Sequence, residues 1–147
     1  ARSMAATAAY TLTCLTEKAE KIKDSDSEQV SSEEPKALRD ALEQKRATEL
    51  DLSTLRLRTL PASIKELAHL ERLDLSNNDL TTLPQDLFEC QNIRWLDLSY
   101  NRLVCLPPTL VMLLDLEYLN IQGNEFADAD QVAHSFRRVF PDCEVRV

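Results

Sequence analysis

Few residues of the types that perform catalysis or bind metals occur in this sequence, and their spacing favours neither activity. The two histidines, His69 and His134, are far apart, and neither has a cysteine or carboxylate at the spacing of metal ligands. The four cysteines are Cys14, Cys90, Cys105 and Cys143. Their spacing is too wide and irregular for a zinc site or a disulfide framework. We therefore expect no catalytic residues, no metal site and a reducing environment.

The glycine content and the net charge narrow the possible ligands further. The chain has a single glycine, Gly123, whereas loops that bind phosphates or dinucleotides need several glycines for close backbone approach. A formal charge of −8 at pH 7 disfavours direct binding to nucleic acid or anionic membranes. No apolar run approaches the ~20 residues needed to span a bilayer. We expect no cofactor, and a protein as the binding partner.

The residues that favour protein binding are aromatic and lie at a regular interval. Trp95, the only tryptophan, lies midway in sequence between Arg72 and Tyr118, and Tyr100 follows it closely. Tryptophan and tyrosine are enriched at the energetic centres of protein interfaces. We therefore predict a partner contact at these residues. In the alternative interpretation, Arg72 only stacks over Trp95, or the N-terminal arm covers it.

A second candidate series is acidic and has the same interval. Its members are Asp51, Asp74 and Asp97. Carboxylates on one surface would attract a partner with a basic segment. They would equally serve only to keep that surface hydrated, since charged faces are usually solvated. Both interpretations stay open from the sequence.

A regular sequence repeat positions both series. Leucines recur at 50, 73, 96 and 119, asparagines at 78, 101 and 124, and Leu–Pro steps at 60–61, 83–84 and 106–107. The Leu–Asp–Leu alternation predicts short strands with leucine inward and aspartate outward. One unit cannot bury its leucines alone, so neighbouring units must stack into a parallel sheet. The asparagine amides are expected to satisfy backbone groups in their own repeat and the next.

The segments RLDLSNNDLTTLP (72–84) and WLDLSYNRLVCLP (95–107) carry a family resemblance. They resemble the leucine-rich-repeat pattern L-x-x-L-x-L-x-x-N-x-L-x-x-L-P. The 23-residue length and the Leu–Pro step are similar to the intracellular Ras-group (Ras-suppressor-like) class. The resemblance covers about 47–126. It implies an α/β fold, a short curved solenoid with a parallel sheet on its concave face.

The segments outside the repeats are expected to cap the solenoid, because its open ends would otherwise expose leucines. We divide the chain into a helical arm and cap (1–46), four repeats (47–126) and a C-terminal cap (127–147). In the arm, amphipathic helices are predicted over 5–23 and from Pro35 onward, separated by an acidic linker near 23–33 that contains a candidate phosphoacceptor, Ser25. In the C-terminal cap, Asp128 or Asp130 should begin a helix over 131–139. Residues 144–147 are a candidate last strand.

These observations together predict a non-catalytic protein-interaction module, an accessory or scaffold subunit of a hetero-complex that binds a partner on its concave face. The predicted contact residues are Trp95, Tyr118, Tyr100, Arg72, Asp51, Asp74 and Asp97. The resemblance also allows a regulatory adaptor that docks on a signalling enzyme such as a small GTPase or phosphatase. The expected location is intracellular and cytoplasmic. A mitochondrion or another organelle is the alternative, because residues 1–16 contain Arg2 and no acid, as the end of a transit peptide would.

Overall fold

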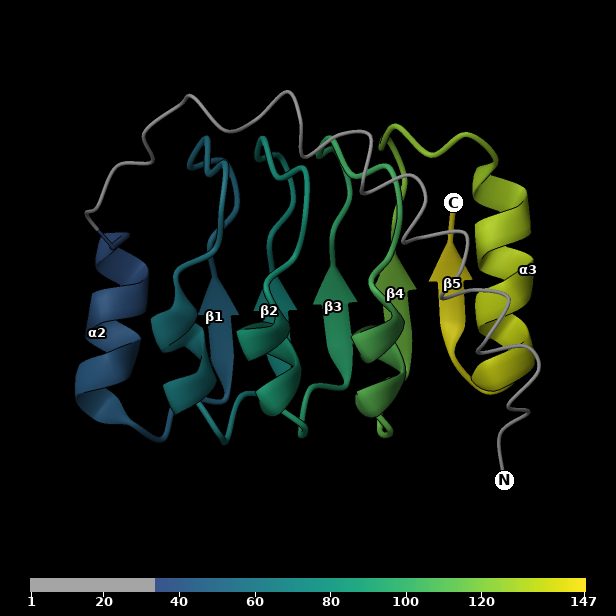
Figure 1. The fold of residues 1–147 in the computed structure, drawn as a ribbon. Helices are drawn as coiled ribbons and strands as arrows, with labels where there is room; N and C mark the ends of the chain where they lie inside the picture. Colours follow the sequence, from purple (N-terminus) through teal and green to yellow (C-terminus); the bar gives the residue numbers. More distant parts are fainter. Residues whose placement is uncertain (1–33) are drawn as a thin grey trace.

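A single parallel sheet forms one layer of the molecule. The computed structural model describes residues 34–147; the helix predicted over 5–23, the linker near 23–33, Cys14 and Ser25 lie outside the described residues. Five strands lie side by side in sequence order (Figure 1). They are β1 (Glu49–Asp51), β2 (Arg72–Asp74), β3 (Trp95–Asp97), β4 (Tyr118–Asn120) and β5 (Glu144–Arg146). The predicted one-strand-per-repeat arrangement is confirmed, and β5 adds a strand from beyond the repeats.

Short 3-10 helices form the second layer, on the opposite side of the core (Figure 1). They are η1 (Ala62–Glu66), η2 (Gln85–Glu89) and η3 (Pro108–Met112). A proline precedes each of them, with φ of −59°, −70° and −66° at Pro61, Pro84 and Pro107. The pyrrolidine ring fixes φ at these values, so each Leu–Pro step determines where the chain turns back.

Leucines from every repeat fill the space between the two layers. The strand centres Leu73, Leu96 and Leu119 are fully buried, and so are Leu75 and Leu98 two residues further on. Complete burial of one such side chain stabilises the fold by roughly 1.5–3 kcal/mol relative to its exposure. The predicted inward position of the leucines is thus confirmed.

A ladder of buried asparagines joins the turns that follow the strands. Asn101 Nδ2 donates to the carbonyls of Leu98 (3.1 Å) and Leu75 (2.9 Å), and its Oδ1 accepts from the Leu80 N–H (3.1 Å). Asn78 and Asn124 make equivalent bonds. Each amide therefore bridges to the preceding repeat, not to the next one as predicted, because the Leu75 carbonyl faces the repeat that follows it.

The direction of this ladder explains an irregularity in the first repeat. Leu55 stands where the other repeats have asparagine, and its backbone N–H donates to Asn78 Oδ1 at 3.0 Å. An asparagine at 55 would have no preceding repeat whose backbone it could satisfy. The first repeat therefore takes part in the ladder through its backbone alone: the N–H groups of Leu55 and Leu57 donate to Asn78 Oδ1, and the Leu52 carbonyl accepts from Asn78 Nδ2.

The N-terminal end of the solenoid is covered by α2 (Lys36–Gln44), which packs against β1 and η1 (Figure 1). Leu38 and Ala41 are buried in this contact, as predicted. Pro35 occupies the N-cap position, just before the first turn. Its ring suits this boundary because the backbone N–H that it lacks would have no partner within the helix.

The C-terminal end is covered by α3 (Ala129–Val139) and β5, which confirms the predicted helix and strand. Asp128 is the N-cap and accepts a hydrogen bond from the Gln131 N–H at 2.9 Å. Arg137 donates to the Val145 carbonyl at 2.8 Å. Because β5 is the last strand, this bond satisfies an edge carbonyl that would otherwise be open to pairing. None of the helices within residues 34–147 is long and apolar enough to span a membrane.

Candidate partner-binding face

The outward side chains of successive strands form a stacked row on the sheet. Arg72, Trp95 and Tyr118 are partners in the strand register. The Arg72 Cζ lies 3.9 Å from the Trp95 ring centroid. The rings of Trp95 and Tyr118 stack with centroids 5.1 Å apart and an interplanar angle of 4°. The Arg146 Cζ lies 5.6 Å from the Tyr118 ring centroid. We call these four residues the aromatic row.

Stacking determines which part of Trp95 a partner would meet. One ring face contacts Arg72 and the other contacts Tyr118, so the half-exposed indole presents its edge. That edge carries Nε1–H, which donates no hydrogen bond within the described part of the chain. Exposed cation–π contacts contribute about 0.5–1 kcal/mol, and an aromatic pair about 0.5–1.5 kcal/mol. The row is therefore held in one geometry before any partner binds.

The two arginines of the row differ in their charge partners. Arg146 forms an ion pair with Glu144 at 3.0 Å, and this hydrogen bond raises the pKa of Arg146. Arg72 forms no ion pair with any residue of 34–147, although Glu49 is its register partner on β1. Within that range, Arg72 is thus an uncompensated cation beside the exposed edge of Trp95.

The predicted acidic series lies beside the aromatic row. Asp51, Asp74 and Asp97 are partners in the strand register. In each, Oδ1 accepts both the N–H (2.9 Å) and the hydroxyl (2.6 Å) of the serine two residues later. The bonds from Ser53 lower the pKa of Asp51. Each aspartate therefore shapes its own turn with one oxygen, a role that the recurring Asp-x-Ser spacing could have indicated.

Tyr100 lies in the turn beyond β3. Its ring packs against Gly123 and does not join the aromatic row. Both residues have positive φ, 54° and 67°, as do Thr54 and Asn77 at the equivalent positions. A Cβ at residue 123 would come within 2.4 Å of the Tyr100 ring, so only glycine fits there. Tyr100 is 58% exposed. The only glycine of the chain, one repeat length after Tyr100, was the sequence signal for this contact.

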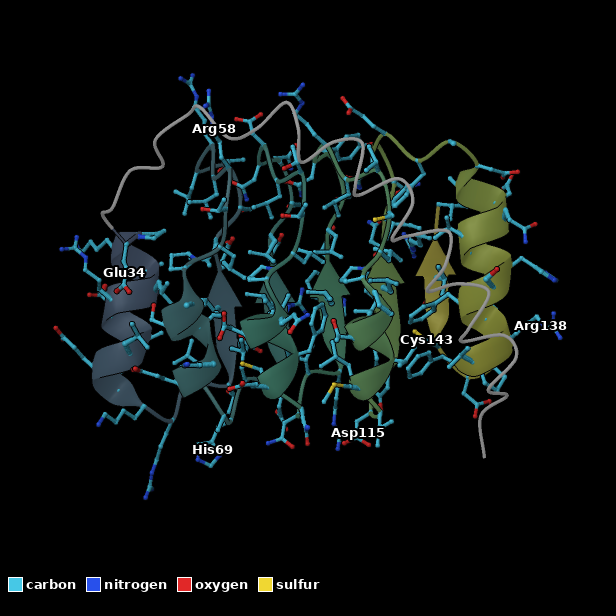
Figure 2. All side chains as sticks on the ribbon, in the orientation of Figure 1. Glu34, Arg58, His69, Asp115, Arg138 and Cys143 are labelled. Atoms are coloured by element: carbon cyan, nitrogen blue, oxygen red, sulfur yellow. The ribbon has the colours of Figure 1, made fainter. Side chains whose placement is uncertain are left out.

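The described cysteines and histidines lie apart from this face. Cys90 and Cys143 are buried, and burial raises the pKa of both thiols to about 11, which opposes formation of a nucleophilic thiolate. His69 and Asp115 lie at the rim opposite Arg58, in different repeats (Figure 2). Across residues 34–147, no group of three or more His, Cys, Asp or Glu residues is arranged to hold a metal ion.

Comparison with known proteins relates the repeats to one family. Residues 68–126 match the leucine rich repeat family. A leucine-rich-repeat protein of Leptospira interrogans is 32% identical, with a TM-score of 0.62 over 68% of this chain and 25% of its own length. The leucine-rich repeat domain of the type III effector XopL is 21% identical, with a TM-score of 0.53 over 84% of this chain and 46% of its own length.

The matches cover only part of each related protein. This chain spans about a quarter of the Leptospira protein and less than half of the XopL domain. A comparison with curated protein sequences finds no match. Leucine-rich-repeat domains generally mediate protein–protein interaction, and solenoids of this kind present a concave surface to partners. Residues 68–126 match the leucine rich repeat family, and residues 34–147 fold as a short leucine-rich-repeat solenoid.

Proposed function

We propose that this chain is a non-catalytic module that holds a partner protein on its sheet face, as an accessory or scaffold subunit of a larger assembly. The aromatic row is the observation that carries the proposal. Trp95 and Tyr118 are half-exposed on adjacent strands and held parallel by their stack. Rigid aromatic side chains contribute contact area at a low entropic cost, which is why they are enriched at interface centres.

The charges of the face suit a partner with a predominantly basic segment. The aromatic row offers donors at Arg72 and Trp95 Nε1, whereas the aspartates offer acceptors about 6.6–6.8 Å away, two residues further along each strand. The outward carboxylates outnumber the two guanidinium groups of Arg72 and Arg146; they are those of Glu49, Asp51, Asp74, Asp97 and Glu144. A partner with basic side chains along one edge and an acceptor opposite Arg72 would match both rows.

We also infer the repeat class, the chain organisation and the compartment from the same features. The 23-residue units with Leu–Pro steps support the Ras-group class and a division at 1–46, 47–126 and 127–147. Burial of Cys90 and Cys143 as thiols supports a reducing, intracellular location. Docking on a signalling enzyme is the alternative function. Binding that depends on the partner's bound nucleotide or on phosphorylation would favour this alternative.

Quantitative affinity purification from native extract tests the proposed function. Tagged full-length protein is compared with Trp95→Ala/Tyr118→Ala. Arg94→Ala/Glu117→Ala is the matched control, because these exposed residues immediately precede the two aromatics and pair with each other at 3.7 Å. Circular dichroism first verifies that each variant is folded.

We expect one stoichiometric set of proteins to be lost from the aromatic variant and retained by the control. The partner from that set, once purified, should bind the aromatic variant at least ~30-fold more weakly, since interface centres contribute about 2 kcal/mol or more. Retention of every protein by the aromatic variant would contradict binding on the sheet face.

A further inference from the structure

Arg72 differs from the cations that pair with a carboxylate of an adjacent repeat. Such ion pairs among residues 34–147 are Lys65–Asp86 (3.7 Å), Arg94–Glu117 (3.7 Å) and Arg102–Glu125 (3.6 Å). Arg72 also has a carboxylate in the next repeat, because Glu49 is its register partner on β1. Its Cζ nevertheless lies over the Trp95 ring, 3.9 Å from the centroid. Stacking thus holds the guanidinium away from Glu49, and its side-chain N–H groups have no partner within 34–147.

The indole N–H of Trp95 is a second unpaired donor beside Arg72. Across residues 34–147, Thr109 Oγ1 is the one buried polar side-chain atom without a hydrogen-bond partner, so the unpaired Trp95 Nε1 is accessible to solvent. The two residues are register partners on β2 and β3, where strands lie about 4.7–4.9 Å apart. A carboxylate has two oxygens and accepts from charged N–H donors at about 2.7–2.9 Å. One carboxylate can therefore accept from both residues.

We propose that the partner anchors on these two donors with one aspartate or glutamate side chain that lies within its basic segment, an inference that rests on the proposed function. A guanidinium binds a carboxylate through a planar fork of hydrogen bonds, about twice as strong as neutral ones. A backbone carbonyl could accept the same bonds, but it would leave the charge of Arg72 uncompensated. A carboxylate supplies both the acceptors and the opposite charge.

The charges around Arg72 favour a carboxylate over a phosphate. The outward carboxylates of the face are those of Glu49, Asp51, Asp74, Asp97 and Glu144. They repel a phosphate, with a charge of about −1.5 to −2, more strongly than a carboxylate with a single charge. Lysines or arginines that flank the anchor would face the aspartates, about 6.6–6.8 Å from Arg72 along the strand direction. The pattern expected in the partner is therefore one acidic residue between basic residues.

Nuclear magnetic resonance of the isotope-labelled full chain tests this anchor. Trp95 is the only tryptophan, so its indole N–H gives a unique resonance. The probes are two amidated pentapeptides, KKDKK and KKNKK, which differ only in the central carboxylate. The shift of the indole resonance during titration gives the dissociation constant of each peptide. We expect KKDKK to bind at least ~10-fold more tightly, although its net positive charge is lower, because hydrogen bonds between charged groups are the stronger ones.

Arg72→Gln separates the anchor from the general attraction of the acidic face for basic peptides. The ratio of the two dissociation constants should then lose its preference for KKDKK. Arg94→Gln is the matched control, because Arg94 is exposed, directly precedes Trp95 and pairs with Glu117. The ratio should be unchanged in this variant. Each ratio compares two peptides on the same protein, so the effect of the substitution on net charge largely cancels.

Equal binding of the two peptides by the wild type would overturn the anchor, and so would a preference for KKDKK that survives Arg72→Gln. An indole resonance that does not shift with KKDKK would overturn it too. Tighter binding of a peptide with phosphoserine at the central position would show that the donors select a phosphate, not a carboxylate. None of these outcomes decides the proposed function, which affinity purification with Trp95→Ala/Tyr118→Ala tests separately.

Discussion

The interior turns and the sheet face use the same 23-residue interval in different ways. The turns repeat one residue type, whereas the first outward position of each strand carries a different residue in each repeat. The turn residues are Asn78, Asn101 and Asn124; the face residues are Arg72, Trp95 and Tyr118. The asparagines bond to the backbone of their own and the preceding repeat. The face residues contact one another and solvent.

This difference separates structural from functional candidates within one chain. Each repeat presents nearly the same backbone groups to its asparagine, so the internal chemistry requires the same side chain every time. No such requirement applies at the first outward position of each strand, where Arg72, Trp95 and Tyr118 lie. The aspartates at the second outward position differ, because each bonds to a serine of its own turn. An outward residue that is large and unlike its neighbours, such as Trp95, is therefore the better candidate for binding.

Substitution of an interior asparagine should give the largest effect on stability. Asn101→Ala would leave the Leu80 N–H without its side-chain partner. It would also remove one of the two asparagine donors to the carbonyls of Leu75 and Leu98, which keep Asn78 and Asn124 respectively. The unsatisfied N–H costs about 1–3 kcal/mol, and each of the two lost hydrogen bonds to the carbonyls costs about 0.5–1.5 kcal/mol more. We expect the free energy of unfolding to fall by about 3 kcal/mol or more in urea denaturation.

The exposed Asn92 provides the control for this substitution. Asn92 Nδ2 makes one hydrogen bond, to the Ala68 carbonyl at 2.8 Å. Its replacement by alanine should cost no more than about 1 kcal/mol, since water can replace that bond. Equal losses for Asn92→Ala and Asn101→Ala would show that the ladder contributes nothing specific to the fold.

The aromatic row should contribute less to stability. A double-mutant cycle with Trp95→Ala and Tyr118→Ala should give a coupling free energy of about 0.5–1.5 kcal/mol, as expected for a stacked pair. The exposed ion pair of Arg94 and Glu117 joins the same two strands and should couple by less than about 0.5 kcal/mol. A coupling near zero between the two rings would mean that they do not stack in solution.

The repeat made most of the fold predictable from the sequence, because strands, turns and core positions follow from one pattern. The strand leucines, the Leu–Pro steps and the helices α2 and α3 lie where they were predicted, whereas the helix predicted over 5–23 lies outside the described residues. The asparagines bond within their own repeat, as predicted, but the neighbouring repeat that they reach is the preceding one and not the next. Sequence spacing places an asparagine at a turn, but the carbonyl orientation that selects its partner depends on the assembled sheet.

The composition of the aromatic row was predictable only in part. The interval placed Arg72, Trp95 and Tyr118 together, and their strand register is as expected. Arg146 was missed because it belongs to β5, outside the periodic segment. The bonds from serine to aspartate were also missed, although Asp-x-Ser recurs in three repeats. Local hydrogen bonds of this kind depend on the turn geometry, which the sequence pattern alone does not specify.

The smallest effect should come from Asp51, a face residue that also stabilises its turn. The Ser53 hydroxyl and N–H lower the pKa of Asp51, so the folded state favours the ionised carboxylate. A depressed pKa contributes stability above the unfolded pKa of about 3.9 and loses it as the pH falls through the folded value. The difference in the free energy of unfolding between wild type and Ser53→Ala should therefore have its full value at pH 7 and pH 5 and a smaller value at pH 3.

Urea denaturation at these three pH values measures the difference, and Asp51→Asn provides the reference background. Because asparagine does not ionise, the effect of Ser53→Ala should have no pH dependence in that background. If Ser53→Ala costs the same at every pH in the wild type, the hydroxyl does not favour the ionised carboxylate. Asp51 would then have no structural role in its turn. It would be a solvent-exposed residue of the sheet face alone, as Trp95 is.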